Sequence, residues 1–256
     1  MILFEIKNQV ATLTLNRPEK YHSFVREMAL DLQEKLEICK NDNNIRAIVI
    51  TGTGKAFCAG QDLGEAIDPN GPELQKIVNE HYNPIIRQIR NIEKPIIAAV
   101  NGVAAGAGAS IALCCDIIIA KEGAVFVQAF SKIGLVPDSG ATFFLPRLIG
   151  FQKASALMMN ADPITATEAE RLGMIYKVIE ESKFENEIKS FSEKLAKMPT
   201  KGIGLTKKLL NQSMHNSLEK QLDEEEVAQT IAGKTNDYKE GVSAFLEKRK
   251  PNFKGN

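Results

Sequence analysis

Two short β-branched runs, each followed at once by a glycine-rich turn, constrain the fold of this chain more than any other feature. Ile45 to Thr51 (IRAIVIT) leads into GTGKAFCAGQDL, and Pro95 to Val100 (PIIAAV) leads into NGVAAGAGAS. Continuous apolar runs of this length are typical of strands that are buried on both faces, as in a parallel sheet. The unit of strand, glycine turn and helix occurs twice, so the sequence predicts an α/β core with a weak internal repeat.

Further strand patterns surround these two units. Residues 2–7 and 10–15 alternate in hydrophobicity and predict an N-terminal hairpin. The runs at residues 115–120 (CDIIIA) and 124–127 are expected to continue the sheet.

Helical spacing accounts for much of the remaining sequence. Met28, Leu32 and Leu36 recur on one face of a helix that follows the turn Asn16-Arg17-Pro18. Residues 73–90 are expected to form a long helix with a kink at Pro84, because proline removes a backbone donor.

The character of the chain changes after about residue 151. Capping boxes at Thr165-x-x-Glu168 and Ser182-x-x-Glu185 mark two helix starts, and Gly173 is placed to end the first helix. Nearly all of residues 200–256 is expected to be helical, with many charges. We therefore divide the chain into an α/β core, residues 1–195, and a helical oligomerisation region, residues 196–256.

An uncharged stretch of twenty residues, Ile96 to Cys115, is about long enough to cross a bilayer. Asn101-Gly102 interrupts it, and Gly106, Gly108 and several alanines dilute its hydrophobicity. We therefore expect no membrane span here.

Charge and cysteine usage narrow the class of protein. The 256 residues carry 32 basic and 32 acidic side chains, and this balance argues against a nucleic-acid binder. Four cysteines without C-x-x-C spacing read as reduced, buried thiols, and the N-terminus with its early Glu5 does not resemble a signal peptide. A cytoplasmic location is expected.

The glycine turns do not match known phosphate or nucleophile motifs. GTGKAF lacks the upstream glycine and the Ser/Thr of a Walker A loop, and GAGAS lacks the third glycine of a dinucleotide fingerprint. No G-x-S-x-G elbow or H-E-x-x-H motif is present, and no metal is expected.

Backbone chemistry is the remaining role for these turns. Glycine and alanine after a strand let a ligand approach exposed N–H groups, and two such turns on neighbouring strands can direct two donors at one point. That arrangement would make an oxyanion hole. The alternative is that the glycines only allow close packing of helix on sheet.

Several motifs, in this order along the chain, resemble those of the crotonase family of enoyl-CoA hydratases and isomerases. They are NRP at residues 16–18, GKAFCAGQDL at 54–63, NGVAAGAGAS at 101–110, CDIIIA at 115–120, GLVPDSG at 134–140 and EGVSAFLEKRKPNF at 240–253. The resemblance implies a spiral of ββα units with a helical C-terminal region, assembled as a homotrimer or homohexamer. It also implies an acyl-CoA thioester substrate and no cofactor beyond this coenzyme A. The thioester oxygen would be held by the backbone N–H groups of Gln61 and Ala107.

The resemblance also indicates the reaction. The hydratases of the family hold a water between two glutamates, and motif alignment places Ser110 and Phe130 at those positions. The carboxylate in this region is instead Asp138, where many isomerases of the family carry their single acid/base. We expect a pocket of residues such as Phe130 and Val136 to raise its pKa. Without the resemblance, Pro-Asp-Ser-Gly reads as a turn.

Within the family, residues 81–138 look most like the isomerases of phenylacetate degradation, which act on the ring epoxide of phenylacetyl-CoA. An isomerase of that kind, or one that converts 3-enoyl-CoA to 2-enoyl-CoA, is therefore expected. A hydratase with unusual catalytic residues is one alternative. A non-catalytic relative that binds RNA or a protein is another, although the neutral charge argues against RNA.

The resemblance implies a set of substrate-contacting residues. His81 is expected to be a surface helix residue, Asp62 and Asp116 read also as caps or backbone braces, and His22 stands where relatives commonly carry Asn. The residues expected to contact the acyl group or coenzyme A are Lys20, Ala59, Gln61, Asp62, Leu63, Tyr82, Phe130, Phe245 and Lys248.

Overall fold

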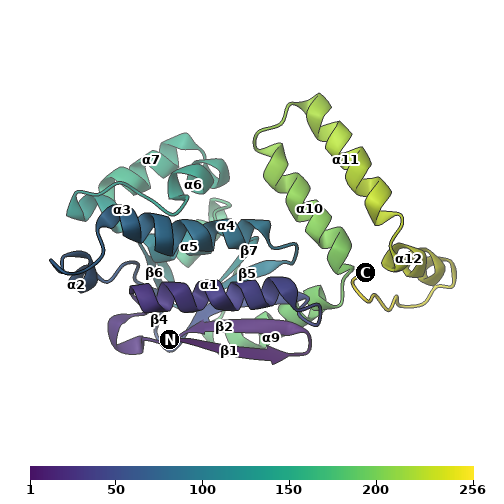
Figure 1. Cartoon of the computed structure of the whole chain (residues 1–256), viewed down its shortest axis with the longest axis horizontal. Helices are drawn as coiled ribbons and strands as arrows, with labels where there is room; N and C mark the ends of the chain where they lie inside the picture. The colour runs from purple at the N-terminus through teal and green to yellow at the C-terminus, as the bar shows by residue number, and fades with distance from the viewer.

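A six-stranded sheet forms the centre of the computed structural model, which describes all 256 residues (Figure 1). Its order is β1-β2-β3-β5-β7-β10, with β1 antiparallel to β2 and the other pairs parallel. The bounds are β1 Ile2–Lys7, β2 Val10–Leu15, β3 Ala47–Gly52, β5 Ile96–Val100, β7 Ile117–Lys121 and β10 Lys177–Ile179. The expected hairpin and buried parallel strands are confirmed.

A second sheet of four short strands takes the order β4-β6-β8-β9. Its strands are β4 Ala56–Cys58, β6 Val103–Ala105, β8 Val125–Val127 and β9 Ile164–Thr165. The expectation that residues 124–127 continue the first sheet is wrong, because the turn through Gly123, with φ +84°, carries β8 into the second sheet. Consecutive strands alternate between the two sheets: the first strand of each pair β3–β4, β5–β6 and β7–β8 lies in the six-stranded sheet and the second in the four-stranded sheet. This alternation confirms the spiral of ββα units.

Both faces of the six-stranded sheet are covered, which explains the continuous apolar runs. Ile48 and Ile50 face the main core together with Met28, Leu32 and Leu36 of α1 (Arg26–Asn41), as their spacing predicts. On the opposite face of the sheet, residues of β2, β3, β5 and β7 contribute to a smaller apolar cluster under α9 (Phe184–Ala196). They are Val10, Ala47, Val49, Ile97, Ala99 and Ile119. The α5 helix (Ala107–Cys114) is buried along its whole length.

The stretch predicted as one kinked helix is α3 (Leu74–Lys76), a π-helical turn η2 (Ile77–Tyr82) and α4 (Asn83–Asn91). Pro84 cannot donate a backbone hydrogen bond, and Gln33 Nε2 instead donates to the carbonyls of Glu80 and His81. The wide turn buries both His81 and Tyr82. The prediction of a surface position for His81 is therefore wrong.

Short helices complete the core. They are η1 Pro18–Lys20, α2 Leu63–Ala66, η3 Ala129–Ile133, α6 Ala141–Ile149, α7 Phe151–Asn160, α8 Ala166–Arg171 and η4 Glu181–Lys183. The Thr165 hydroxyl accepts a hydrogen bond from Glu168 N, as its capping box predicts. The box at Ser182 does not form, because Ser182 already lies inside η4 and α9 begins without a side-chain cap.

Three C-terminal helices extend from one end of the core: α10 (Thr200–Ser213), α11 (Leu218–Ala232) and α12 (Asn236–Leu246) (Figure 1). The buried Arg46 donates to Thr200 and to the carbonyls of Met198 and Phe253, which attaches this region and the chain's last residues to the sheet. A division between residues 195 and 196 remains our proposal. None of the helices combines the length and the apolar character that a membrane crossing requires.

Candidate active site

The peptide that precedes Gln61 is held in one orientation. Gly60 adopts φ +91°, and its carbonyl accepts a hydrogen bond from Phe24 N at 2.6 Å, while Asp62 N donates to Phe24 O at 2.8 Å. Because the C=O and N–H of a trans peptide point in opposite directions, the Gln61 N–H points away from Phe24. It has no acceptor in the chain.

A second free donor lies beside it. Ala107 is the first residue of α5, so its N–H has no acceptor within the helix. A Cβ placed on Gly60 would lie only 3.2 Å from Ala107 N, so the two turns meet at this point. The positive end of the α5 dipole adds to the field. The two turns therefore meet, and each carries an N–H group without an acceptor in the chain.

Phe130 and Ser110 lie against the same turn. Phe130 is buried, and a Cβ placed on Gly106 would lie 4.0 Å from its Cζ. The buried Ser110 hydroxyl donates to Gly106 O at 3.1 Å. Neither side chain can serve as a carboxylate base here, and the Phe130 ring keeps this side of the site apolar.

Asp138 lies on the turn that precedes α6. The Ser139 hydroxyl donates to its Oδ1 at 2.9 Å. Burial raises the pKa of the Asp138 carboxyl above its ordinary value, although the Ser139 hydrogen bond acts in the opposite direction. Next to it, a Cβ on Gly140 would lie within 4 Å of Phe144 and Ile86, so the turn packs on α6 and α4.

Val136 does not contribute to that burial. Its residue is 79 % exposed, because the turn directs it away from the core. The expectation that Val136 lines the pocket is therefore wrong for the single chain.

Tyr82 lies beside Gln61. Its ring is buried, and its hydroxyl donates to Gln61 Oε1 at 2.9 Å. Burial raises the pKa of Tyr82 well above its ordinary value, and the charges of Asp138 and Glu65 add to the effect.

Glu65 is the residue near the site that the sequence reasoning missed. Its Oε2 accepts from Gln61 Nε2 at 2.8 Å, and its Oε1 accepts from Arg26 N at 2.8 Å. Gln61 precedes the N-cap residue Asp62 and lies outside α2, so helical spacing along the sequence does not predict its contact with Glu65.

Several expected coenzyme A contacts lie along the same edge. Tyr21 O accepts from Ala59 N at 2.9 Å, which places the exposed Lys20 beside the Gln61 turn. Leu63 is half exposed at the start of α2. The Asp62 carboxylate caps α2 through Gly64 N and pairs with Arg17 at 2.7 Å, as the reading as a cap predicts.

His22 braces this edge. With φ +57° it accepts a hydrogen bond from Arg17 N at Nδ1, and its Nε2 lies 2.7 Å from Thr53 O. The pair of contacts fixes the neutral tautomer with the proton on Nε2, because a carbonyl can only accept. The side chain is fully buried and holds the backbone rather than facing the solvent.

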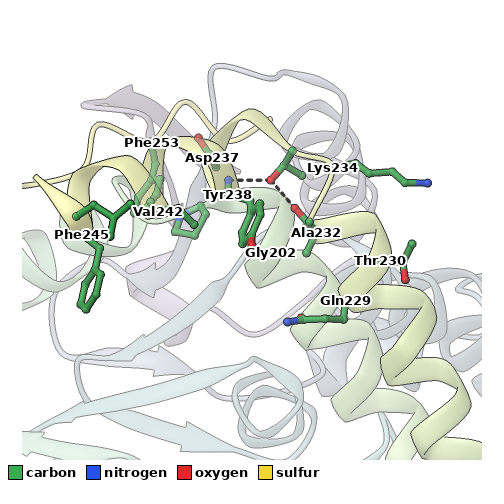
Figure 2. A pocket seen from close by; sticks show the side chains of 15 residues that line it. Gly202, Gln229, Thr230, Ala232, Lys234, Asp237, Tyr238, Val242, Phe245 and Phe253 are labelled. Carbon is green, nitrogen blue, oxygen red and sulfur yellow. Dashed lines mark hydrogen bonds between the residues drawn. The ribbon is translucent and has the colours of Figure 1, made fainter.

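Phe245 and Lys248 lie elsewhere. Phe245 lies in the last turn of α12 and Lys248 just after the helix, at the opposite end of the molecule from α2 (Figure 1). Figure 2 shows the groove between α10, α11 and α12, with Phe245 turned outward at its margin, and this residue is 82 % exposed. The structure of one chain does not bring these two residues to the Gln61 turn.

The half-buried Asp116 has structural contacts. Asp116 accepts from Ile96 N and pairs with Arg90 and Lys207, so it braces the sheet as expected. All four cysteines are free and buried. No group of three or more His, Cys, Asp or Glu side chains is arranged to hold a metal ion.

Comparison with known proteins identifies the family of this chain. The family described as enoyl-CoA hydratase/isomerase matches residues 5–256. The 1,2-epoxyphenylacetyl-CoA isomerase of Escherichia coli is 46 % identical over 99 % of this chain and 98 % of its own length. A probable enoyl-CoA hydratase of Rhodobacter capsulatus is 40 % identical over the same shares of the two chains.

Solved structures give the same result for the fold. A putative enoyl-CoA hydratase/isomerase of Mycobacterium abscessus superposes with a TM-score of 0.93 at 36 % identity, and the match covers 99 % of both chains. The chain therefore belongs to the crotonase family of enoyl-CoA hydratases and isomerases, enzymes of CoA thioesters.

Proposed function

We propose that the protein is an acyl-CoA isomerase that moves a proton with Asp138 and stabilises the enolate with the N–H groups of Gln61 and Ala107. The observation that carries this proposal is the pairing of two free N–H donors, on turns that meet, with a half-buried carboxylate, Asp138, that accepts a hydrogen bond from Ser139. The two positions that resemble the water-holding glutamates of hydratases are Ser110 and Phe130, and neither can activate water.

The reaction follows from these groups. For a 3-enoyl thioester, the Asp138 carboxylate takes a proton from the carbon next to the carbonyl, and the electron pair moves onto the thioester oxygen. The two N–H groups hold this oxyanion. Protonated Asp138 then returns the proton to the far end of the conjugated system, so no atom is gained or lost. A raised pKa makes Asp138 a better base for this step.

The acyl group is either the ring epoxide of phenylacetyl-CoA or a 3-enoyl chain. The 46 % identity to the isomerase of Escherichia coli over nearly the whole length supports the first. We propose a cytoplasmic, trimeric or hexameric enzyme that needs no cofactor besides the coenzyme A of its substrate. The four free, buried thiols support a reducing compartment.

The substitution Asp138→Asn tests the proposal, because Asn keeps the size and can still accept from Ser139. We expect isomerisation of the ring-epoxide or 3-enoyl thioester to fall by about 10²- to 10⁴-fold with little change in affinity. The wild-type enzyme in D₂O should give a product of unchanged composition apart from exchanged deuterium.

The substitution Asp223→Asn, on the exposed side of α11, is the matched control and should leave activity unchanged. Full activity of the Asp138→Asn variant would assign the base elsewhere. Efficient hydration of crotonyl-CoA by the wild type would favour a hydratase instead.

A further inference from the structure

The side-chain amide of Gln61 is held at both ends. Its Oε1 accepts from the buried Tyr82 hydroxyl at 2.9 Å, and its Nε2 donates to Glu65 Oε2 at 2.8 Å. A carboxylate can only accept, so Glu65 selects the orientation in which the amide nitrogen faces it. Gln61 is therefore fixed between the π-helical turn η2 and the short helix α2.

Glu65 also ties α2 to the first long helix. Its other oxygen accepts from Arg26 N, and Arg26 Nη1 in turn lies 2.6 Å from Glu80 in η2. Apolar burial of α2 is limited: Leu63 at its start is half exposed, Ile67 just after it is mostly exposed, and Ala66 packs against the main core. These polar contacts, with the Asp62 cap, fix the segment that follows the oxyanion donor.

We propose that Glu65 is a positioning residue that acts through the Gln61 side chain to hold the Gln61 N–H at the substrate oxygen. This inference rests on the proposed function. An oxyanion donor has to lie about 2.7 to 3.1 Å from the charged oxygen, and a misplacement of about 1 Å can cost on the order of 100-fold in rate. Because the contact matters most in the transition state, its loss lowers kcat more than it changes KM.

Glu65 does not act as a second base in this arrangement. Each of its oxygens already accepts a hydrogen bond from a nitrogen donor. Its removal should therefore leave the acidic limb of the pH–rate profile in place, since that limb belongs to Asp138.

A double-mutant cycle tests the proposal. We expect Glu65→Ala and Gln61→Ala each to lower kcat by about 10- to 100-fold, with KM within about threefold of wild type. The double variant should lose no more than Gln61→Ala alone, because both remove the same restraint. Glu65→Gln should stay within about threefold of wild type, because the Gln61 amide can flip and re-form the hydrogen bond.

Glu73→Ala is the matched control, since Glu73 is an exposed glutamate in the same segment and caps nothing with its side chain. Multiplying losses in the double variant, or an unaffected Glu65→Ala enzyme, would overturn the inference and leave the role of Asp138 intact. If Glu65→Gln were as inactive as Glu65→Ala, and Asp138→Asn were active, Glu65 would be the base and the proposed function would fail with it.

Discussion

At the scale of single residues, Gly60 shows how closely the candidate site depends on backbone space. A side chain there would meet Ala105 O at 3.0 Å and Ala107 N at 3.2 Å, and the φ of +91° is strained for any L residue. The glycine thus lets the two donor turns approach each other.

We expect Gly60→Ala to lower kcat/KM by at least about 100-fold, because a displaced turn misplaces an oxyanion donor. Stability should fall by about 1 to 2 kcal/mol. Gly54→Ala is the control: Gly54 also has a positive φ, of +70°, but a Cβ there meets nothing within 4 Å. Steady-state kinetics of both variants separates backbone strain from obstruction of the site. Equal activity losses in the two would contradict this account.

His22 makes stability depend on pH. Burial lowers the pKa of its imidazole below the ordinary value of 6.5, so at moderately acidic pH the unfolded chain binds a proton that the folded chain resists. The free energy of unfolding should therefore fall as the pH drops below 6.5. The neutral tautomer that braces Arg17 and Thr53 is what acidification removes.

The substitution His22→Asn should make this acid sensitivity smaller, since Asn tolerates the left-handed backbone and does not titrate. A loss of about 1 kcal/mol at neutral pH is expected from the missing hydrogen bond. Urea unfolding at about pH 7 and about pH 5 measures both effects. As a control, the exposed His215→Gln variant should keep the wild-type dependence of stability on pH. Burial also lowers the pKa of His81. If His22→Asn kept the wild-type dependence as well, the effect would belong to His81.

At the scale of elements, local sequence patterns predict which helices and strands form, but not the sheet that a strand joins or the burial of a residue in a wide helical turn. The continuous apolar run of β3 and the spacing of α1 report burial directly, so both were predicted correctly. The run at residues 124–127 carries the same signal, but its sheet is chosen by the turn at Gly123. His81 looked exposed because helical periodicity does not include the extra residue of a π-turn.

The candidate site divides in the same way. The glycine turns and the carboxylate in a turn can be recognised along the sequence. The hydrogen bond of Tyr82 to Gln61, in contrast, joins residues 21 positions apart, and that of Glu65 depends on the four-residue helix α2. Only the packed fold shows that these side chains meet.

The α10 helix is anchored by a buried lysine. Lys207 Nζ lies 2.7 Å from Asp116 Oδ2 and donates to the carbonyls of Ile89 and Lys94. Burial lowers the pKa of Lys207 while Asp116 opposes the shift. Lys207→Met would leave Asp116 with Arg90 and two carbonyls without their donor.

We expect Lys207→Met to lower stability by about 2 to 4 kcal/mol, less than the range of about 3 to 5 kcal/mol for breaking a buried pair, because Asp116 keeps Arg90 as a partner. The neighbouring exposed Lys208→Met should change it by less than about 0.5 kcal/mol. Thermal unfolding followed by circular dichroism measures both. A Lys207 variant as stable as its control would show that the apolar packing of α10 and its Arg90–Asn211 hydrogen bonds suffice without this lysine.

At the scale of the whole molecule, the C-terminal helices carry more apolar surface than a monomer needs. Leu210, Leu218, Val227, Phe245 and Leu246 are all exposed by more than half. They belong to the three helices that extend from the core, and Phe245 and Leu246 also line the groove of Figure 2. An assembly of this chain into trimers or hexamers would cover such a surface, and light scattering that returned a 28.2 kDa monomer at micromolar concentration would contradict it.

The position of α12 predicts which subunit supplies Phe245 and Lys248. These residues lie at the far end of their own chain from the Gln61 turn, so we expect them to contact coenzyme A bound to a neighbouring subunit (Figure 1). Lys248→Ala should then raise KM more than it lowers kcat, because a contact remote from the reacting carbons is shared by ground and transition states.

Mixed oligomers test this placement. Co-expression of an Asp138→Asn subunit with a subunit that carries Phe245→Ala and Lys248→Ala, purified through two different tags, gives assemblies in which both kinds are present. If α12 serves the neighbouring site, some sites combine an intact Asp138 from one subunit with an intact α12 from the other. Activity at low substrate concentration should then exceed the sum of the two parent enzymes. If α12 serves its own site, every site keeps one defect whichever subunits surround it, and the mixture can do no better than its parents.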